Sequence, residues 1–280
     1  MTPSLPPGPL YVAAAASAAG PATDAAALLA GEPVALMARI RARADGGLVL
    51  WWWQGDVFGK RPGEITRRLL RISGVGFNRI RRQPDGLWES TMSEAGYYAD
   101  ADTGEILDAW TNPYTGREVR PEHNRLKLHY LIEPGGVIRP AMPGVPFEGR
   151  VGPAIVSGDT VWMSERLAAS FPAAPPPKPG ADPGPDGGKA PKGLIGEPME
   201  VTHFVASVAD VNDARLEVVP ATMSHSTIWS FYPWLGMEPA SGYVITEIIG
   251  RKVADEAAVP AALRARIDRD HPGLFGSPGI

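Results

Sequence analysis

Apolar and polar residues alternate along most of the chain, in short segments separated by Gly, Pro, Asn and Asp. This alternation is typical of β-strands, because successive side chains of a strand point to opposite faces of a sheet. We expect strands near residues 35–44, 48–54, 67–73, 76–82, 87–99, 105–111, 126–132, 159–165, 200–210, 215–229 and 242–250. Frequent short strands with compact turns favour a mainly β fold over alternating βαβ units. The predicted architecture is a single antiparallel, barrel-like (calycin-like) domain with a few flanking helices.

Two segments have the pattern of helices instead. Residues 24–31 predict a short helix with Asp24 as its N-cap and Gly31 at its end. Near the C-terminus, Val259, Leu263 and Ile267 recur every four residues, as on one face of a helix. We expect this second helix to plug or cover one end of the β structure.

The pattern divides the chain into an N-terminal arm (residues 1–34), one β-rich domain (35–271) and a C-terminal tail (272–280). Within the domain, residues 172–193 are dense in Pro, Gly, Ala and Lys and lack apolar periodicity. Such a segment buries too little apolar surface to offset its ordering entropy, so we expect a disordered insertion between two strands. An inter-domain linker is the alternative, but the strands that follow are too few for a separate core.

Composition and charge exclude several classes of function. The chain has 27 basic and 31 acidic residues, a net charge of −4, without the basic excess typical of nucleic-acid binding. It contains no Cys, which excludes disulfides, thiolate nucleophiles and iron–sulfur clusters. A Gly-rich dinucleotide fingerprint, a P-loop, a His-Glu-x-x-His motif and a Gly-x-Ser-x-Gly motif are also missing. We therefore expect no nucleic-acid partner and no cofactor.

The location of the protein is predicted from two further features. No stretch of the sequence is long and apolar enough to span a bilayer. The N-terminus lacks the basic start and the strong apolar core of a secretory leader. We expect a cytoplasmic protein with no membrane partner.

Two histidines are candidates for acid–base chemistry. His203 and His225 each alternate in phase with apolar neighbours, which predicts that both face the interior. Imidazole titrates near neutral pH, so a buried His can serve as a general acid or base. The alternative is a core histidine bonded to a backbone carbonyl. A metal site of His129, His203 and His225 is a further alternative, which their scattered spacing does not directly support.

Aromatic residues gather around residues 51–58, 97–114 and 229–234. Because neighbours on a strand face opposite sides, at least one of Trp51, Trp52 and Trp53 must point away from the other two. If the strands close as a barrel, one set of rings lines the interior and suits a flat aromatic ligand, although ordinary core packing is the alternative. The predicted substrate-binding residues are Trp53, Trp110, Asn112, Tyr114, His129, Trp229, Tyr232 and Trp234. Asn112 begins an Asn-Pro turn, so a role as a turn cap is the alternative for that residue.

Basic residues concentrate between Lys60 and Arg82, where eight Lys or Arg accompany one acidic residue, Glu64. A solvated strand face is the ordinary interpretation. Strand alternation makes it difficult for all of them to face outward, and one that faces inward would bind a carboxylate or phenolate. We take Arg71 and Arg79 as candidates for this anion clamp, and Tyr97 as a candidate proton donor.

Three stretches resemble a known family. Residues 102–107 (Asp-Thr-Gly-Glu-Ile-Leu) and 110–116 (Trp-Thr-Asn-Pro-Tyr-Thr-Gly) are similar to the signature stretch of the DUF1838 family, and residues 231–237 (Phe-Tyr-Pro-Trp-Leu-Gly-Met) to its C-terminal signature. The resemblance runs from about Ala38 to Asp270. It implies a β-rich, barrel-like fold in bacterial proteins, with the Pro-rich insertion as an addition. The leader peptide of some relatives is absent, which favours the cytoplasm. The family has no assigned function and implies no catalytic residues.

Two hypotheses about function follow. The first is a cofactor-independent, lyase-type enzyme that decarboxylates, dehydrates or cleaves a C–C bond in a phenylpropanoid- or lignin-derived aromatic molecule. His225 or His203 would be the base, Tyr97 the proton donor, and Arg71 or Arg79 the clamp. The second is a carrier of an aromatic or hydrophobic ligand without chemistry.

One observation separates the two hypotheses. An enzyme should bring His, Tyr and Arg to one cavity, whereas a carrier should have a mostly apolar cavity with a single polar anchor. Under both hypotheses the partner is a small aromatic molecule, and assembly into a homo-oligomer stays open.

Overall fold

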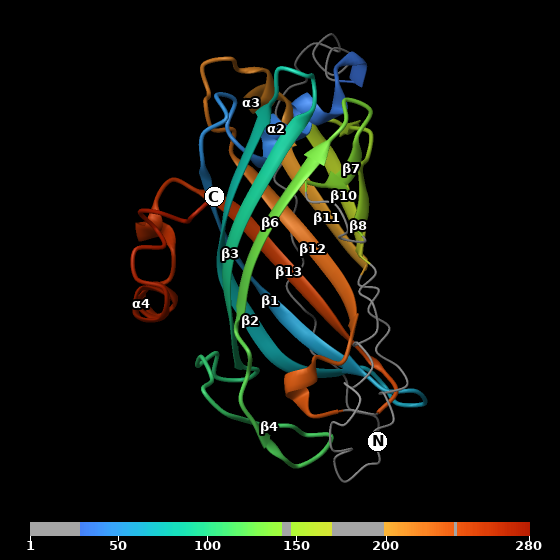
Figure 1. Cartoon of the computed structure of the whole chain (residues 1–280), viewed down its shortest axis with the longest axis vertical. Coiled ribbons are helices and arrows are strands. Elements are labelled where there is room, and N and C mark those ends of the chain that lie inside the picture. The colour runs from blue at the N-terminus through green and yellow to red at the C-terminus, as the bar shows by residue number, and fades with distance from the viewer. Residues whose placement is uncertain (1–28, 142–146, 170–198, 238–239) are drawn as a thin grey trace, which may run out of the picture.

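The structure is a computed structural model, which describes residues 29–141, 147–169, 199–237 and 240–280. Most of the expected arm and all of the insertion at 172–193 lie outside these residues. Of the predicted helix at 24–31, only the end is described, where Leu29 and Ala30 are helical. Ten antiparallel strands close into a barrel (Figure 1). The prediction of a mainly β, barrel-like single domain is therefore confirmed.

Each barrel strand pairs with the next, and the pairing of β10 with β11 closes the sheet on itself. The barrel strands are β1 (Val49–Lys60), β2 (Arg67–Arg82), β3 (Trp88–Asp100), β6 (Asn124–Ile132), β7 (Val137–Pro140), β8 (Phe147–Val151), β10 (Thr160–Ala169), β11 (Met199–Ser207), β12 (Ala221–Ser230) and β13 (Tyr243–Val253). Closure leaves alternate residues of every strand pointing into a shared interior. This interior is where a site can form.

The remaining elements lie around the barrel. The short strand β9 (Ile155–Ser157) pairs with the start of β10, and β4 (Trp110–Thr111) pairs with β5 (Glu118–Val119) in a separate small sheet. The helices that lie wholly within the described residues are α2 (Pro33–Arg41), α3 (Val208–Asn212) and α4 (Ala261–Asp270), with two 3-10 turns, η1 (Pro233–Leu235) and η2 (Glu256–Ala258). None of the helices in the described residues is long and apolar enough to cross a membrane.

The helix α2 closes one end of the barrel. It lies at the top of Figure 1, and Val34, Met37 and Ile40 on it are fully buried. These side chains join Trp51, Tyr130 and other inward residues in the largest apolar cluster. The prediction of a strand at 35–44 was wrong, because the apolar positions of this segment fit a helix that is buried on nearly all sides.

The helix α4 confirms the prediction of a C-terminal helix but not its place. It lies along the side of the barrel in Figure 1 and packs Leu263 and Ile267 on the outer faces of β2 and β3, against Phe77 and Tyr97. It therefore covers the wall of the barrel and plugs neither end. The tail that follows packs there too, since Ser93 Oγ donates a hydrogen bond to Pro278 O at 2.9 Å.

The strand predictions succeeded where the strands are long. The segments 67–73 and 76–82 form the single strand β2, because nothing interrupts the pairing of Leu70 to Arg82 with β3. Most of 105–111 is loop, with only Trp110 and Thr111 in β4. The strands β7, β8 and β9 have only three to five residues each and were missed. Turns at 45–47, 84–86, 102–104 and 112–116 are present, each with a glycine at positive φ.

Candidate functional site

The interior contains a cavity of about 470 Å³. That volume is within the range of pockets that bind drug-sized molecules, ~300–1,000 Å³. At one limit the cavity reaches Arg41 at the end of α2, and at the other it reaches His123 and Trp234 in the loops at the opposite end of the barrel. Its two ends differ in chemistry, and each is described in turn.

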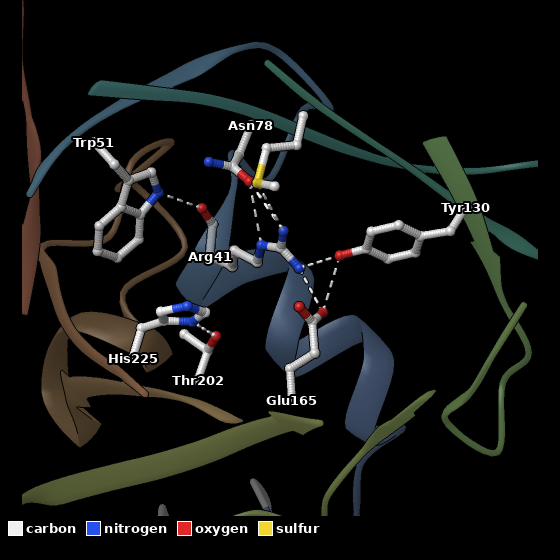
Figure 2. A network of polar contacts seen from close by, with 8 residues as sticks. Arg41, Trp51, Asn78, Tyr130, Glu165, Thr202 and His225 are labelled. Atoms are coloured by element: carbon white, nitrogen blue, oxygen red, sulfur yellow. Dashed lines mark hydrogen bonds and ion pairs between the residues drawn. The ribbon is translucent and has the colours of Figure 1, made fainter. Parts of the chain in front are cut away.

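The end of the cavity beside α2 holds a buried ion pair between Arg41 and Glu165, with a nitrogen–oxygen distance of 2.5 Å (Figure 2). Arg41 also donates to the Tyr130 hydroxyl, and through Nη2 to Asn78 Oδ1 at 3.0 Å. Tyr130 in turn donates to Glu165 Oε2 at 3.0 Å. The guanidinium of Arg41 thus extends from α2 into the barrel and donates its hydrogen bonds to side chains of the barrel wall.

The charge of this network is balanced within itself. Burial disfavours the charged guanidinium, but Glu165 and Tyr130 outweigh that effect and raise the pKa of Arg41. Burial raises the pKa of the Tyr130 hydroxyl, which stays neutral. Arg41 therefore remains a cation that is already paired with a carboxylate.

Two more carboxyl groups face the cavity, Glu94 from β3 and Glu200 from β11. Within the described residues, neither side chain accepts a hydrogen bond or forms an ion pair, and the surface that each retains faces the cavity. Burial, and the charge of Glu200, raise the pKa of Glu94 to about 7. Burial, and the charge of Glu165, raise the pKa of Glu200 to about 7. Both groups change protonation near neutral pH, which suits a general acid or base.

His225 on β12 faces the same cavity, as the sequence predicted. Its two ring nitrogens are hydrogen-bonded to threonines, Nδ1 to Thr202 Oγ1 at 2.9 Å and Nε2 to Thr227 Oγ1 at 2.6 Å. Burial, and the positive charge of Arg41, lower the pKa of His225 to about 4. A neutral imidazole with both nitrogens occupied favours the interpretation of a structural histidine, whose partners are hydroxyls rather than a backbone carbonyl.

Aromatic rings surround the other end of the cavity. The ring of Trp234 lies 5.0 Å from that of Tyr98 and 6.1 Å from that of Tyr232, with Trp229 also in the lining. Tyr232 and Thr246 share a hydrogen bond between hydroxyls at 3.1 Å. Burial raises the pKa values of Tyr98 and Tyr232, so both remain neutral phenols. This end suits the flat face of an aromatic or cationic group.

Trp53 occupies the wall between the two ends. It pairs with Gly74 of β2 on one side and Gly250 of β13 on the other, and Gly74 pairs with Gly96 of β3. A Cβ at Gly74 would lie 2.4 Å from the Trp53 ring, and one at Gly96 would lie 2.5 Å from it. These glycines leave the space in which the indole lies flat against the wall. Trp51 and Trp53 are buried on the inside and Trp52 faces outward, as strand alternation predicted.

The structure brings five of the predicted site residues to the cavity and places the others elsewhere. The five are Trp53, His225, Trp229, Tyr232 and Trp234. Trp110, Asn112 and Tyr114 lie in the loops at the aromatic end of the barrel, outside the cavity lining. Asn112 is fully buried, donates to Leu235 O at 2.7 Å and accepts from Tyr114 N at 2.8 Å, so it ties the turn to η1 as the capping alternative proposed.

The expected meeting of His203 with His225 and a guanidinium was wrong. His203 is exposed on the outer face of β11, because Glu200, Thr202 and Phe204 occupy the inward positions of that strand. The sequence argument placed the apolar residues inside, whereas this part of the interior is polar. His129 is exposed on the outside as well, where it contacts Glu89 at 2.9 Å. The three histidines of the metal alternative therefore cannot share an ion, and no metal-binding group of three or more is found in the described residues.

The predicted anion clamp and proton donor also lie outside the cavity. Arg71 is exposed and Arg79 half-buried on the outer face of β2, out of phase with Ile72, Gly76 and Asn78, which line the cavity. Tyr97 is buried beneath α4, with Arg266 5.4 Å from its ring centre. Burial raises its pKa to about 12.

The guanidinium that does reach the interior, Arg41, was missed, and so were Glu94, Glu165, Glu200 and Tyr98. Arg41 lies in the segment predicted as a strand, and no pattern in the sequence links it to Glu165. A signal was present for Glu94, because it alternates in phase with Gly96 and Tyr98, but the sequence analysis took Tyr97, on the opposite face of that strand, as the site residue.

Comparisons with solved structures return only remote likenesses. A crystal structure of Rv2717c from M. tuberculosis aligns with 70% of this chain and 89% of its own, at 9% identity and a TM-score of 0.23. The MucA/MucB complex of Pseudomonas aeruginosa aligns with 85% of this chain and 97% of its own, at 11% identity and a TM-score of 0.11. Scores this low carry no argument about this chain. No curated protein matches the sequence.

A family model, described as "Protein of unknown function (DUF1838)", matches residues 47–127. The match spans β1, β2, β3 and the loops with the Asp102-to-Gly116 motif, and it does not extend to the second predicted signature at 231–237. The wall that carries Trp53 and Glu94 thus falls within the matched stretch. The resemblance predicted from the sequence is confirmed there: over residues 47–127 this chain matches the DUF1838 family, whose description assigns no function.

Proposed function

We propose that this protein binds one small aromatic molecule inside its β-barrel. The observation that supports this most directly is the cavity of about 470 Å³, with aromatic rings at one end and ionisable groups at the other. Along β3, Glu94 and Tyr98 are four residues apart, which corresponds to ~13 Å. A flat ring bound against Tyr98, Trp229 and Trp234 would therefore direct a polar substituent towards Glu94 and Glu200. A cytoplasmic location remains part of this proposal.

A cavity-filling variant tests the binding proposal. Gly76 lines the cavity, and a Cβ added there would meet no atom closer than 3.4 Å, so Gly76→Val adds bulk to the cavity without a backbone clash. Ser224→Val is the matched control, because Ser224 is exposed on the outer face of β12. Phenol, indole and cinnamate would be titrated while tryptophan fluorescence is recorded, since Trp53, Trp229 and Trp234 line the cavity.

The expected result is saturable binding of at least one compound. Its affinity should fall about tenfold or more in Gly76→Val, which is ~1.4 kcal/mol, and stay unchanged in Ser224→Val. Failure of all three compounds to bind, or equal binding by Gly76→Val, would refute a ligand site in the barrel.

Proton transfer to and from the bound molecule is a second candidate function. The specific observation in its favour is the pair of carboxyls, Glu94 and Glu200, which face the cavity with pKa values raised to about 7. In a lyase-type elimination one carboxylate removes a proton from the substrate, the bond to the leaving group breaks, and the other carboxylic acid protonates that group. The two glutamates would then have the acid–base role that the sequence suggested for His225 or His203 and for Tyr97.

Incubation with lignin-derived aromatic compounds and mass spectrometry of the products tests this second function. Glu94→Gln and Glu200→Gln should each abolish turnover while the compound still binds. Tight binding without product from any compound would leave the protein as a carrier.

A further inference from the structure

The charge of the cavity narrows the class of ligand. The ionisable side chains that line it include four carboxyl groups, from Glu94, Glu122, Glu165 and Glu200, and two guanidinium groups, from Arg41 and Arg125. Arg41 is paired with Glu165. The charge of the ligand that the cavity favours therefore depends on which of these groups have no partner within the protein.

The two guanidinium groups differ in their surroundings. Arg41 uses Nε, Nη1 and Nη2 on Asn78, Tyr130 and Glu165. Arg125 is exposed, and its Nη1 donates to Ser93 Oγ and to Glu94 O, both at 2.9 Å. His225 has both ring nitrogens bonded to threonines. Among the described residues, the enclosed part of the cavity therefore offers a bound anion no free cation, and Arg125 belongs to its exposed rim.

Glu94 and Glu200 differ from Arg41 and His225, because their polar groups are not occupied by other side chains. Each is enclosed by the barrel, directs its carboxyl to the cavity, and has no hydrogen-bond or ion-pair partner in the described part of the chain. Unpaired buried carboxyls are costly unless a ligand satisfies them. The rings of Tyr98, Tyr232 and Trp234 have the π-faces that attract ammonium groups, and the charge of Glu200 acts on the Tyr232 hydroxyl.

We propose that the barrel selects a cationic ligand, an aromatic molecule with an alkylammonium group that lies between Glu94, Glu200 and the aromatic rings. This inference rests on the proposed binding function and makes the ligand an amine rather than a carboxylate or phenolate. The carboxyls would supply the charge, and the rings would stabilise the alkyl groups on nitrogen.

Three probes of similar size and different charge test the inference. Phenyltrimethylammonium is a permanent cation, tert-butylbenzene is its neutral isostere, and cinnamate is an aromatic anion. Each would be titrated into the full chain at pH 8 with tryptophan fluorescence as the readout. The variants are Glu94→Gln, Glu200→Gln and the double variant, and Glu247→Gln on the exposed outer face of β13 is the matched control.

We expect the cation to bind about tenfold or more tightly than its neutral isostere, which is ~1.4 kcal/mol, and cinnamate to bind most weakly. Each single variant should reduce this preference and the double variant should remove it, while binding of tert-butylbenzene shows that the cavity is still formed. Glu247→Gln should keep the preference.

Other results would overturn one or both proposals. Equal or tighter binding of the neutral or anionic probe would refute cation selection and leave the binding function standing. A cation preference that survives in the double variant would refute the role of these two carboxyls. Absence of binding by all three probes would remove the proposed function itself.

Discussion

At the scale of single residues, Arg41 joins the helix α2 to the barrel wall. Its guanidinium contacts Asn78 on β2, Tyr130 on β6 and Glu165 on β10, three strands that are distant along the chain. Removal of one partner of a buried pair leaves the other charge uncompensated, whereas replacement of both by apolar residues is often tolerated. We therefore expect a single substitution in the Arg41–Glu165 pair to lower the free energy of unfolding more than substitution of both residues.

We expect Arg41→Met to lower the free energy of unfolding by about 3–5 kcal/mol, because Glu165 would remain buried without its cation. The double variant Arg41→Met with Glu165→Leu should recover part of that loss. Urea unfolding followed by tryptophan fluorescence measures both values. If the double variant were less stable than Arg41→Met by the full cost of a second substitution, the two residues would not be coupled.

A methyl group at Gly96 tests the wall beneath Trp53. A Cβ there would lie 2.5 Å from the indole, so the ring must move towards the cavity. We expect Gly96→Ala to cost ~1–3 kcal/mol of stability and to reduce ligand affinity. Gly135→Ala is the control, since a Cβ at Gly135 has no neighbour within 4 Å. Equal effects of the two substitutions would show that the indole does not depend on this space.

At the scale of elements, α2 is held to the barrel by a second basic side chain. Lys252 on β13 donates to Ala42 O at 2.8 Å and to Val219 O at 3.0 Å, and it approaches Arg39 O at 3.4 Å. Ala42 and Arg39 are at the C-terminal end of α2, where carbonyl groups lack partners within the helix. A lysine from the wall satisfies them.

Lys252→Met should therefore loosen α2 more than the sheet. We expect a loss of about 1–3 kcal/mol of stability and faster hydrogen exchange at amides of residues 37–41, with β1 to β3 nearly unchanged. Lys127→Met is a suitable control, because Lys127 donates only to the exposed Gly279 O at 3.2 Å. Uniform loss of protection over the whole barrel would argue against a local role for Lys252.

Comparison of the predicted and observed elements shows where the sequence pattern was a reliable guide to structure. Period-two alternation identified the long strands and correctly placed Trp53, His225 and Trp229 inside, because a long strand shows its two faces several times. It failed at β11, where the inward positions include Glu200 and Thr202 and the outward ones include Val201 and Val205. It also failed at α2, whose burial on nearly all sides removes the polar face that identifies a surface helix.

The polar residues of the site could not be predicted from the sequence pattern, for a physical reason. Glu94, Glu165 and Glu200 are exceptions to the rule that charged residues face outward. The pairing of Glu165 with Arg41 exists only because the chain folds into the closed barrel. The aromatic half could be predicted, since large rings on alternating strands are buried whether or not they serve a ligand.

At the scale of the whole molecule, the interior groups predict how stability changes with pH. The pKa values of Glu94 and Glu200 are raised to about 7 by folding, above the unfolded value of 4.5. The folded state then binds more protons than the unfolded state between these values, so their contribution to stability falls as pH rises from 5 to 7. His225, with its pKa lowered to about 4, contributes in the opposite sense between pH 4 and 6.5.

Variants separate these contributions. We compare the double variant Glu94→Gln, Glu200→Gln with the natural chain. The free energy of unfolding of the variant minus that of the natural chain should increase by a few kcal/mol as pH rises from 5.5 to 8. One unit of pKa shift corresponds to ~1.4 kcal/mol. Urea unfolding at pH 5.5, 6.5 and 8 measures the difference, with Glu247→Gln as the control. A difference that does not depend on pH would show that the two carboxyls titrate normally.

The end of the barrel that α2 covers has a consequence for the molecule as a whole. The strands alone would form a tube whose interior carries Glu94, Glu165 and Glu200, and the compensating positive group comes from a helix outside the wall. Withdrawal of that helix would open the tube and, in the same movement, leave Glu165 without its cation. The seal of the barrel and the cation that balances Glu165 thus come from the same nine residues, Pro33–Arg41.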